Sequence, residues 1–326
     1  MKVFVAGATG AVGKRLVPML VARGYDVVGM TTSEAKIAAL EATGATGVVA
    51  DGLDRDAVLH AVSRSEPDVI VHQMTGLTGA GSLKKFDKEF ALTNRLRTDG
   101  TDNLLVAAKL AGVKRFIAQS YGSWNYERTG TGLKSEVDPL DPTPPASQRE
   151  SMAAIRHVED AVVGAGGIAL RYASFYGPGT GFALDGDIVE LVRKRRLPIV
   201  GDGAGVWSFI HMDDAATATV AAIEHGKPGI YNVVDDEPAP VSVWLPELAS
   251  VLGAAAPRRV PVWLGRLAIG EVGVSMMTKI RGTSNAKAKR ELGWRPYYKT
   301  FRDGFRHGLG EVSITEATQR LGNAAD

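Results

Sequence analysis

The sequence predicts a doubly wound α/β fold, in which helices cover both faces of a parallel β-sheet. Two observations support this prediction. A buried strand pattern at residues 3–6 runs directly into a turn spaced by glycines, and an apolar helix pattern follows the turn. Four further strand-and-helix units then follow at the spacing of a parallel sheet with crossover helices. The chain has 326 residues, of which 45% are hydrophobic, so it can bury the large core that this fold requires.

The expected elements follow in a regular order. Hydrophobic patterns predict strands at residues 3–6, 25–30, 46–50, 68–72, 114–119 and 168–172, and helices at 33–42, 54–64, 90–111 and 150–163. Residues 130–148 are rich in proline, glycine and charge, which is typical of a long loop. Beyond residue 176 we expect short strands within 198–213, a strand at 229–234, and helices at 187–196, 214–224, 244–252 and 261–278.

Composition and charge exclude several classes of protein. A formal net charge of +2 gives no field that would attract nucleic acid or a membrane surface. The absence of cysteine excludes a disulfide framework, thiol nucleophiles and cysteine metal sites, and we expect no metal. Residues 260–280 are apolar but contain Arg266, Glu271 and Lys279, which favours a packed helix over a membrane span. The chain begins in a core strand without room for a signal peptide, so we expect a cytoplasmic protein.

The glycine-spaced turn gives the first functional prediction. Gly7 permits the turn, Gly10 lets backbone N–H groups approach a pyrophosphate, and Gly13 lets the following helix pack closely on the strand. The N-terminus of that helix offers unpaired N–H groups and a positive dipole end to the phosphates. Strand, glycine turn and helix in this order predict a dinucleotide-binding loop.

The spacing Gly-x-x-Gly-x-x-Gly resembles the loop of the extended short-chain dehydrogenase/reductases, which include nucleotide-sugar epimerases and dehydratases. Residues 51–54, 100–103, 113–117 and 170–179 resemble further segments of that family. The resemblance implies an NAD(P)-binding Rossmann domain at 1–175, rejoined by 205–235, and a substrate-binding domain at 176–326. It implies cofactor contacts from Gly7, Thr9, Gly10, Ala11, Val12, Gly13, Thr31, Thr32, Lys36, Asp51, Gly52, Leu53, Gln73, Met74, Asn94, Tyr172 and Ser174.

The end of the second strand favours NADP over NAD. A carboxylate at this point would accept a hydrogen bond from the ribose 2′-hydroxyl, whereas basic residues accommodate a 2′-phosphate. The chain has Thr31 and Thr32 there, with Lys36 one turn on and Lys14 and Arg15 in the first helix. Solvated helix charges are the alternative interpretation of these basic residues.

Catalysis in the resembled family uses a Ser or Thr, together with a Tyr-x-x-x-Lys pair that shares one helix face. Ser120, after the fifth strand, matches the Ser or Thr. The helix that would carry the pair has Ser151 and Ile155 at these positions, or Met152 and Arg156 if the alignment is shifted by one residue. None of the eight tyrosines has a lysine four residues later. The pair is therefore absent from the sequence.

Three hypotheses remain open. The chain is a reductase with a relocated proton donor, Tyr121 or Tyr126, and with Arg156 in place of the lysine charge. Alternatively, it is a redox-silent cofactor sensor similar to NmrA-like proteins, or an epimerase or dehydratase that uses other acid–base groups such as His157. We expect the first, an oxidoreductase acting on a small carbonyl or hydroxyl compound.

The second half resembles a substrate-handling segment. Gly201-Asp202-Gly203 and residues 208–214 resemble family motifs, but Val206 and Trp207 stand near the place where the family often has a diphosphate-binding arginine. We therefore expect a small-molecule substrate that is not a nucleotide sugar. The resemblance also implies a homodimer through the long helices of the first domain.

Overall fold

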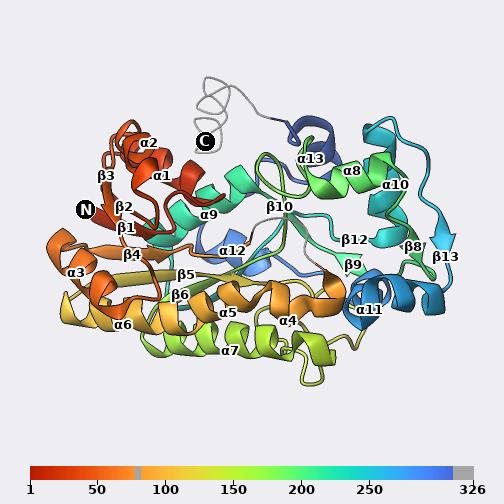
Figure 1. The fold of residues 1–326 in the computed structure, drawn as a ribbon, viewed down its shortest axis with the longest axis horizontal. Coiled ribbons are helices and arrows are strands. Elements are labelled where there is room, and N and C mark those ends of the chain that lie inside the picture. The colour runs from red at the N-terminus through yellow and green to blue at the C-terminus, as the bar shows by residue number, and fades with distance from the viewer. Residues whose placement is uncertain (78–81, 311–326) are drawn as a thin grey trace.

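A seven-stranded parallel sheet forms the centre of the molecule (Figure 1). The computed structural model describes residues 1–77 and 82–310. The sheet has the order β11-β6-β5-β4-β1-β2-β3, and every neighbouring pair is parallel. This confirms the predicted fold class. Its strands are β1 (Lys2–Ala6), β2 (Asp26–Thr31), β3 (Thr46–Val49), β4 (Val69–His72), β5 (Arg115–Tyr121), β6 (Ile168–Tyr172) and β11 (Gly229–Val233).

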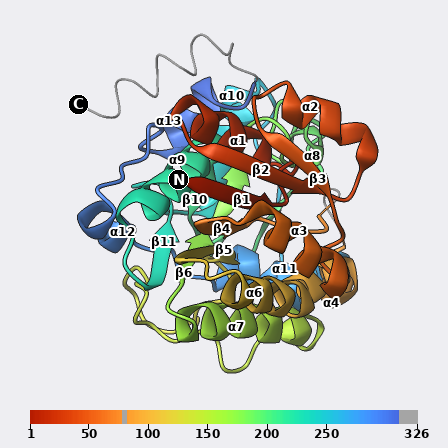
Figure 2. The same ribbon diagram turned by 90° about the vertical axis from the view of Figure 1, so that its left-hand side faces the viewer.

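Helices cover both faces of the sheet, because its strands carry apolar side chains on both faces (Figure 2). On β1, Val3 and Val5 enter one core, whereas Phe4 and Ala6 enter the other. Burying each such valine or phenylalanine contributes about 1.5–3 kcal/mol. The first core is closed by α1 (Gly13–Ala22), α2 (Ile37–Glu41), α9 (Met212–His225) and α12 (Ala286–Glu291). The second is closed by α3 (Arg55–Ser65), α5 (Ala91–Arg97), α6 (Asp99–Leu110) and α7 (Arg149–Gly164).

The single helix expected at 90–111 is wrong, because the segment forms two helices. The chain turns at Thr98, where φ is −96° and ψ is −86°, and the Thr98 hydroxyl donates to the carbonyl of Asn94. The backbone hydrogen bonds from Thr98 to Asn94 and from Asp102 to Thr98 continue across this break, so the apolar periodicity does not record it. Leu110, which the periodicity places on the apolar side, is 75% exposed. A short helix, α4 (Phe86–Glu89), precedes the pair.

The remaining elements surround an aromatic core at one end of the sheet (Figure 1). Trp244 packs against Phe182, Trp207 and Phe209, with ring centroids 5.0–5.8 Å apart. Three two-stranded pieces pair β7 (Ser174–Tyr176) with β10 (Phe209–His211), β8 (Ile199–Val200) with β13 (Arg259–Val260), and β9 (Val206–Trp207) with β12 (Ala239–Pro240). The helices are α8 (Asp187–Arg193), α10 (Val241–Val251), α11 (Val262–Thr278) and α13 (Phe301–His307), and short 3₁₀ turns occupy Glu34–Lys36, Leu83–Lys85 and Ala146–Gln148.

The later part of the chain returns to the central sheet through β11. This strand pairs with β6 along five residues, from Gly229 opposite Ile168 to Val233 opposite Tyr172. Arg115 of β5 holds the end of α9 by donating from Nη1 to the carbonyls of Ala222 and Gly226, each at 2.9 Å. Within the described ranges, no helix is long and apolar enough to span a membrane.

Candidate functional site

The glycine turn between β1 and α1 forms an open cradle. Gly7 has φ +86°, and a Cβ atom there would lie 2.8 Å from the backbone carbonyl of Gln73, so a side chain cannot be accommodated. Gly10 donates its N–H to the carbonyl of Gly7 at 3.0 Å, which tightens the turn. Val12 is the N-cap of α1 and has no side chain able to cap it. Lys14 and Arg15 donate their N–H groups to the carbonyls of Gly10 and Val12. Within the described residues, the N–H groups of Ala11, Val12 and Gly13 make no backbone hydrogen bond and are left for a phosphate group.

The carboxyl ends of β4 and β6 lie beside this cradle and carry two buried polar side chains. Gln73 donates from Nε2 to the hydroxyl of Tyr172 at 3.2 Å, and that hydroxyl bonds with Thr219 at 2.6 Å. The other amide atom of Gln73, Oε1, is buried and has no partner among the described residues. The open cradle and an unsatisfied hydrogen-bond acceptor, both at the carboxyl ends of central strands, fit a bound dinucleotide.

The residues expected around the adenosine half lie at the ends of β2 and β3. The Thr31 hydroxyl lies 3.1 Å from that of Thr9 and accepts from the N–H of Ser33, while Thr32 and Lys36 are exposed. The exposed Asp51 accepts the N–H of Leu53 at 2.9 Å. Gly52 is buried; its carbonyl accepts from Asn103 and a Cβ there would contact the sulfur of Met74.

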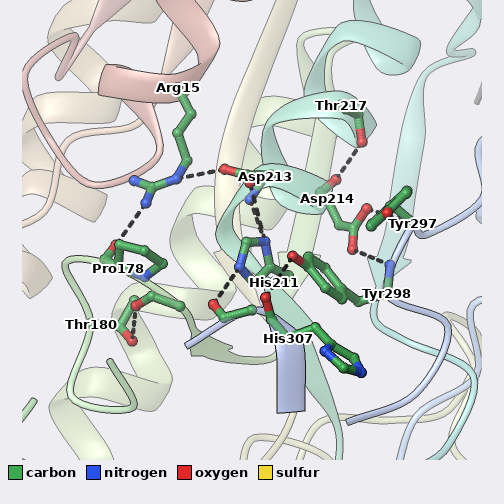
Figure 3. Close-up of polar contacts among 12 residues, drawn as sticks. Arg15, Pro178, Thr180, His211, Asp213, Asp214, Thr217, Tyr297, Tyr298 and His307 are labelled. Atoms are coloured by element: carbon green, nitrogen blue, oxygen red, sulfur yellow. Dashed lines mark hydrogen bonds and ion pairs between the residues drawn. The ribbon is translucent and has the colours of Figure 1, made fainter. Parts of the chain in front are cut away.

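Arg15 is already engaged, although its place in the sequence made it a candidate for the 2′-phosphate (Figure 3). Its Nε donates to Asp213 at 2.7 Å, Nη2 to the carbonyl of Pro178 at 2.8 Å, and Nη1 to that of Ala11 at 3.0 Å. Arg15 thereby ties α1 to the start of α9 and to the loop after β7. Beside it, His211 accepts the N–H of Asp213.

Ser120 and Tyr126, two of the expected catalytic residues, belong to a buried polar network. The Ser120 hydroxyl donates to Glu159 at 2.6 Å, and Glu159 accepts from two guanidinium nitrogens of Arg171 at 2.6 and 2.7 Å. Arg171 also donates to the hydroxyl of Tyr126, which donates to Asn232. Burial raises the pKa of Tyr126 to about 12 despite the charge of Arg171. Both hydroxyls are therefore committed to neighbouring side chains.

Tyr121 ends β5 and is only partly buried. Burial raises the pKa of its phenol, whereas hydrogen bonding to Ser174 and Ser123 and the positive charge of Arg97 lower it. Ser174 begins β7, so hydroxyl groups from two elements meet at the carboxyl edge of the sheet. Such a group of hydroxyls beside a positive charge can hold a substrate oxygen and transfer a proton to it.

Helix α7 places the other expected residues on different sides. Arg156 is exposed and donates from Nη2 to the carbonyls of Leu140 and Asp141, in the loop before the helix. Ser151 is buried and bonds to Asn94 of α5 at 3.0 Å, so α5 and α7 meet at this point. Ile155 is fully buried in an apolar cluster with Trp124 and Met152.

Reasoning from the sequence missed Arg97, which is 4% exposed. Its Nη1 has no hydrogen-bond partner within residues 1–77 and 82–310. Burial lowers the pKa of Arg97 to about 10, although the charges of Tyr121 and Glu159 act in the opposite direction. The sequence spacing could have predicted this burial. Positions 93, 97, 100, 101 and 104 form one helix face, and the four residues that share it with Arg97 are small or apolar and are buried.

A glycine cradle and an uncapped helix at the carboxyl edge of a parallel sheet define a dinucleotide-binding Rossmann protein. A sequence profile gives the particular group, since that of the NAD dependent epimerase/dehydratase family matches residues 3–233. The chain belongs to this family. The agreement confirms the resemblance noted in the sequence.

Two similar curated proteins are reductases. A "3-diazoavenalumate denitrifying reductase" of Streptomyces sp. is 41% identical over 309 residues, covering 93% of this chain and 99% of that protein. A "2-alkyl-3-oxoalkanoate reductase" of Stenotrophomonas maltophilia is 28% identical over 264 residues, covering 78% and 76%. Together with the family, these likenesses make the chain an NAD(P)-binding oxidoreductase of the extended short-chain dehydrogenase/reductase type.

Solved structures share the fold at lower identity. UDP-glucose 4-epimerase of Thermotoga maritima superposes with a TM-score of 0.74 at 21% identity, covering 98% of this chain and 99% of that one. The same enzyme of Thermus thermophilus, solved with NAD, gives 0.70 at 24% identity, covering 95% and 98%. At these identities the likeness establishes the fold.

Proposed function

We propose that the chain is an NADPH-dependent reductase of a small organic substrate, with Tyr121 as the proton donor. One observation carries the proposal: Tyr121 is partly exposed at the carboxyl edge of the sheet, whereas the other expected donor, Tyr126, is buried and bonded to Arg171 and Asn232. Ser120 is bonded to Glu159, so we assign the polarising of the substrate oxygen to Ser174 and Ser123 beside Tyr121.

The cradle of residues 7–13 would hold the pyrophosphate of the cofactor, and Gln73 and Tyr172 would face its nicotinamide half. When bound, the cofactor supplies the hydride. Tyr121 gives its phenolic proton to the substrate oxygen, while Ser174 and Ser123 donate hydrogen bonds that keep this oxygen in place. The hydroxyl groups thereby stabilise the negative charge that develops on the oxygen.

We further propose NADPH over NADH, because no carboxylate follows β2 and the exposed Thr32 and Lys36 leave room for a 2′-phosphate. Arg15 takes no part in this proposal, since it is bonded to Asp213. Thr32→Asp should weaken the binding of NADPH by tenfold or more and leave the binding of NADH within about threefold. A carboxylate repels the 2′-phosphate of NADPH but accepts a hydrogen bond from the ribose hydroxyl of NADH. Equal losses in a fluorescence titration of both cofactors would contradict this assignment.

The names of the two reductase relatives support a small substrate. One is named for a diazo compound and the other for a 3-oxoalkanoate, and neither name describes a nucleotide sugar. The place near Gly203 where the family often has a diphosphate-binding arginine holds Val206 and Trp207 here, which supports the same proposal. Trp207 donates from its indole to the carbonyl of Met276 at 2.9 Å, so it belongs to the packed interior of the second half.

The first experiment is a titration of NADPH and NADH, followed by a panel of carbonyl and diazo compounds monitored at the nicotinamide absorbance. Oxidation of NADPH by a panel member is the expected result. In that assay Tyr121→Phe should lower kcat by about 100-fold or more. Tyr126→Phe serves as the comparison and should keep kcat within about threefold in the folded fraction. Tight binding without oxidation of the cofactor by any compound would favour the sensor hypothesis instead.

We also propose a homodimer through α5, α6 and α7. These helices form one outer layer of the molecule (Figures 1 and 2), and Leu92 on α5 is half exposed within that layer. Light scattering after size exclusion should give about twice the mass of the 34.5 kDa chain. Leu92→Glu should shift the mass toward that of the monomer, and an unchanged mass in both proteins would place the interface elsewhere.

A further inference from the structure

Arg97 is a buried cation whose presence requires a reason. It is 4% exposed, and its Nη1 atom finds no hydrogen-bond acceptor in the described part of the chain. Removing a guanidinium group from water without a partner is costly in free energy. The burial of this cation therefore indicates a role other than stabilising the fold.

The titratable groups near Arg97 do not neutralise its positive charge. Glu159 of α7 is the acid that acts on it, but this carboxylate is bonded to Arg171 and Ser120. His72 of β4 is neutral at physiological pH, because burial lowers its pKa to about 4, and its Nε2 bonds with the carbonyl of Leu96. Tyr121 of β5 is the remaining titratable group on which Arg97 acts.

The position of Arg97 matches the position of a missing charge. In the alignment that places Ser151 at the tyrosine position, the lysine of a Tyr-x-x-x-Lys pair on α7 would stand at residue 155, where this chain has a fully buried isoleucine. Helix α5 packs against α7 at this level, because Asn94 of α5 bonds with Ser151 of α7 at 3.0 Å. The chain runs in the same direction along both segments, because His157 of α7 bonds with Asp102 of α6 further on. Arg97 lies almost one turn after Asn94, as residue 155 lies about one turn after Ser151, so the two residues stand at the same level of the helices.

We propose that Arg97 is a positioning residue whose guanidinium supplies, from α5, the positive charge that stabilises the deprotonated Tyr121. The inference rests on the reductase function proposed above. When Tyr121 gives its proton to the substrate oxygen, the phenolic O–H bond breaks and negative charge remains on the phenol oxygen. Arg97 stabilises this charge until a proton from water restores the phenol, and Arg97 stays protonated throughout.

The phenol can be followed directly, without turnover. We would place 3-fluorotyrosine at position 121 by genetic-code expansion and titrate the full-length protein by ¹⁹F NMR, since fluorine brings the phenol into a measurable pH range. Arg97→Gln should raise the titration midpoint by about one unit or more, because an opposite charge nearby lowers a phenol pKa by this amount. Arg97→Lys should keep the midpoint within about half a unit of the unsubstituted protein.

Two controls separate this effect from general damage. Arg95→Gln changes an exposed arginine on the same helix, which pairs with Asp99, and should leave the midpoint unchanged. The same fluorine label at position 126, whose hydroxyl is bonded to Arg171, should not respond to Arg97→Gln. The Gln variant is expected to fold, because removing a buried cation that lacks a partner removes a desolvation cost.

Each outcome decides one point. A raised midpoint in Arg97→Gln with rescue by Arg97→Lys supports the proposal. An unchanged midpoint overturns it, even if Tyr121→Phe loses turnover. A higher KM in Arg97→Gln with an unchanged midpoint and kcat would overturn it in favour of a substrate anchor. Full turnover in Tyr121→Phe would refute the proposed proton donor itself, whatever the fluorine titration gives.

Discussion

Glu159 and Arg171 form a buried ion pair whose loss should be costly. Both side chains are almost fully buried, and the carboxylate accepts three hydrogen bonds, including the one from Ser120. Glu159→Gln leaves the guanidinium without its counter-charge, which costs about 3–5 kcal/mol in buried pairs. Urea unfolding measures this loss. The comparison is Glu190→Gln on α8, whose partner Lys194 is 55% exposed, so the loss of this pair should change the unfolding free energy far less. An equal loss of unfolding free energy in the two variants would show that the Glu159–Arg171 pair is no more important for stability than an exposed pair.

Asp214 should make stability depend on pH in an unusual direction. Burial raises the pKa of this carboxyl to about 7, although it accepts the N–H groups of Tyr297 and Tyr298 (Figure 3). Since the pKa in the folded state exceeds the unfolded value, the folded state binds more protons between about pH 4 and pH 7. The contribution of Asp214 is fully present below this window and is lost as pH rises through about 7.

Asp214→Asn removes this titration and isolates it from the other carboxyl groups. The difference in unfolding free energy between the unsubstituted protein and the variant should fall by a few kcal/mol from pH 5 to pH 8. Urea unfolding at both pH values measures it. A difference that stays constant with pH would show that Asp214 has an ordinary pKa in the folded protein.

At the residue scale the sequence predicted the glycine turn between β1 and α1 but not the burial of Arg97. Gly7, Gly10 and Gly13 stand in one continuous stretch, so their spacing alone identifies the turn. Arginine is nearly always exposed, and its burial depends on α5, α7 and β5 coming together from distant parts of the chain. The hydrogen bond that engages Ser120 also depends on Glu159, 39 residues away.

At the scale of elements, α11 has a kink that depends on one glycine. Gly270 has φ +73° inside the helix, and a Cβ there would lie 3.1 Å from Cγ of Lys84. The kink lets residues 272–277 enter the interior while Trp263 and Leu267 remain largely exposed. The sequence predicted the extent of this helix but not its bend.

Gly270→Ala should therefore lower the unfolding free energy by about 1–3 kcal/mol, because a residue with a side chain is strained at the positive φ and extended ψ of Gly270. Gly164→Ala, near the end of α7, is the matched control. A Cβ atom at Gly164 would meet no described atom within 4 Å, and its φ is not positive, so alanine there should be neutral or stabilising. Thermal unfolding of both variants distinguishes the two sites. A neutral Gly270→Ala would mean that α11 straightens without cost.

At the scale of the whole molecule, we expect one cooperative unfolding transition. Four of the five tryptophans lie beyond residue 200, so tryptophan fluorescence reports on the later part of the chain. Far-UV circular dichroism reports on all helices. Because β11 completes the sheet and α9 packs on α1, both signals should give the same urea midpoint. Separate midpoints would mean that the two parts unfold independently.

The fold class was predictable because each strand-and-helix unit is a local pattern and right-handed crossovers leave few arrangements for them. The aromatic core around Trp244 was not predictable, because its rings come from residues between 176 and 305, and no local pattern records that these residues meet.

The position of β11 also decides where this chain can be recombined with its relatives. A chimera joined once near residue 175 would take β1 to β6 from one parent and the edge strand beside β6 from the other. The contacts of Arg115 with Ala222 and Gly226, and of Arg15 with Asp213, would then cross between parents. A chimera that exchanges substrate preference within this family therefore needs two further junctions, one on each side of the segment from α9 to β11. This segment then stays with the parent that supplies the sheet.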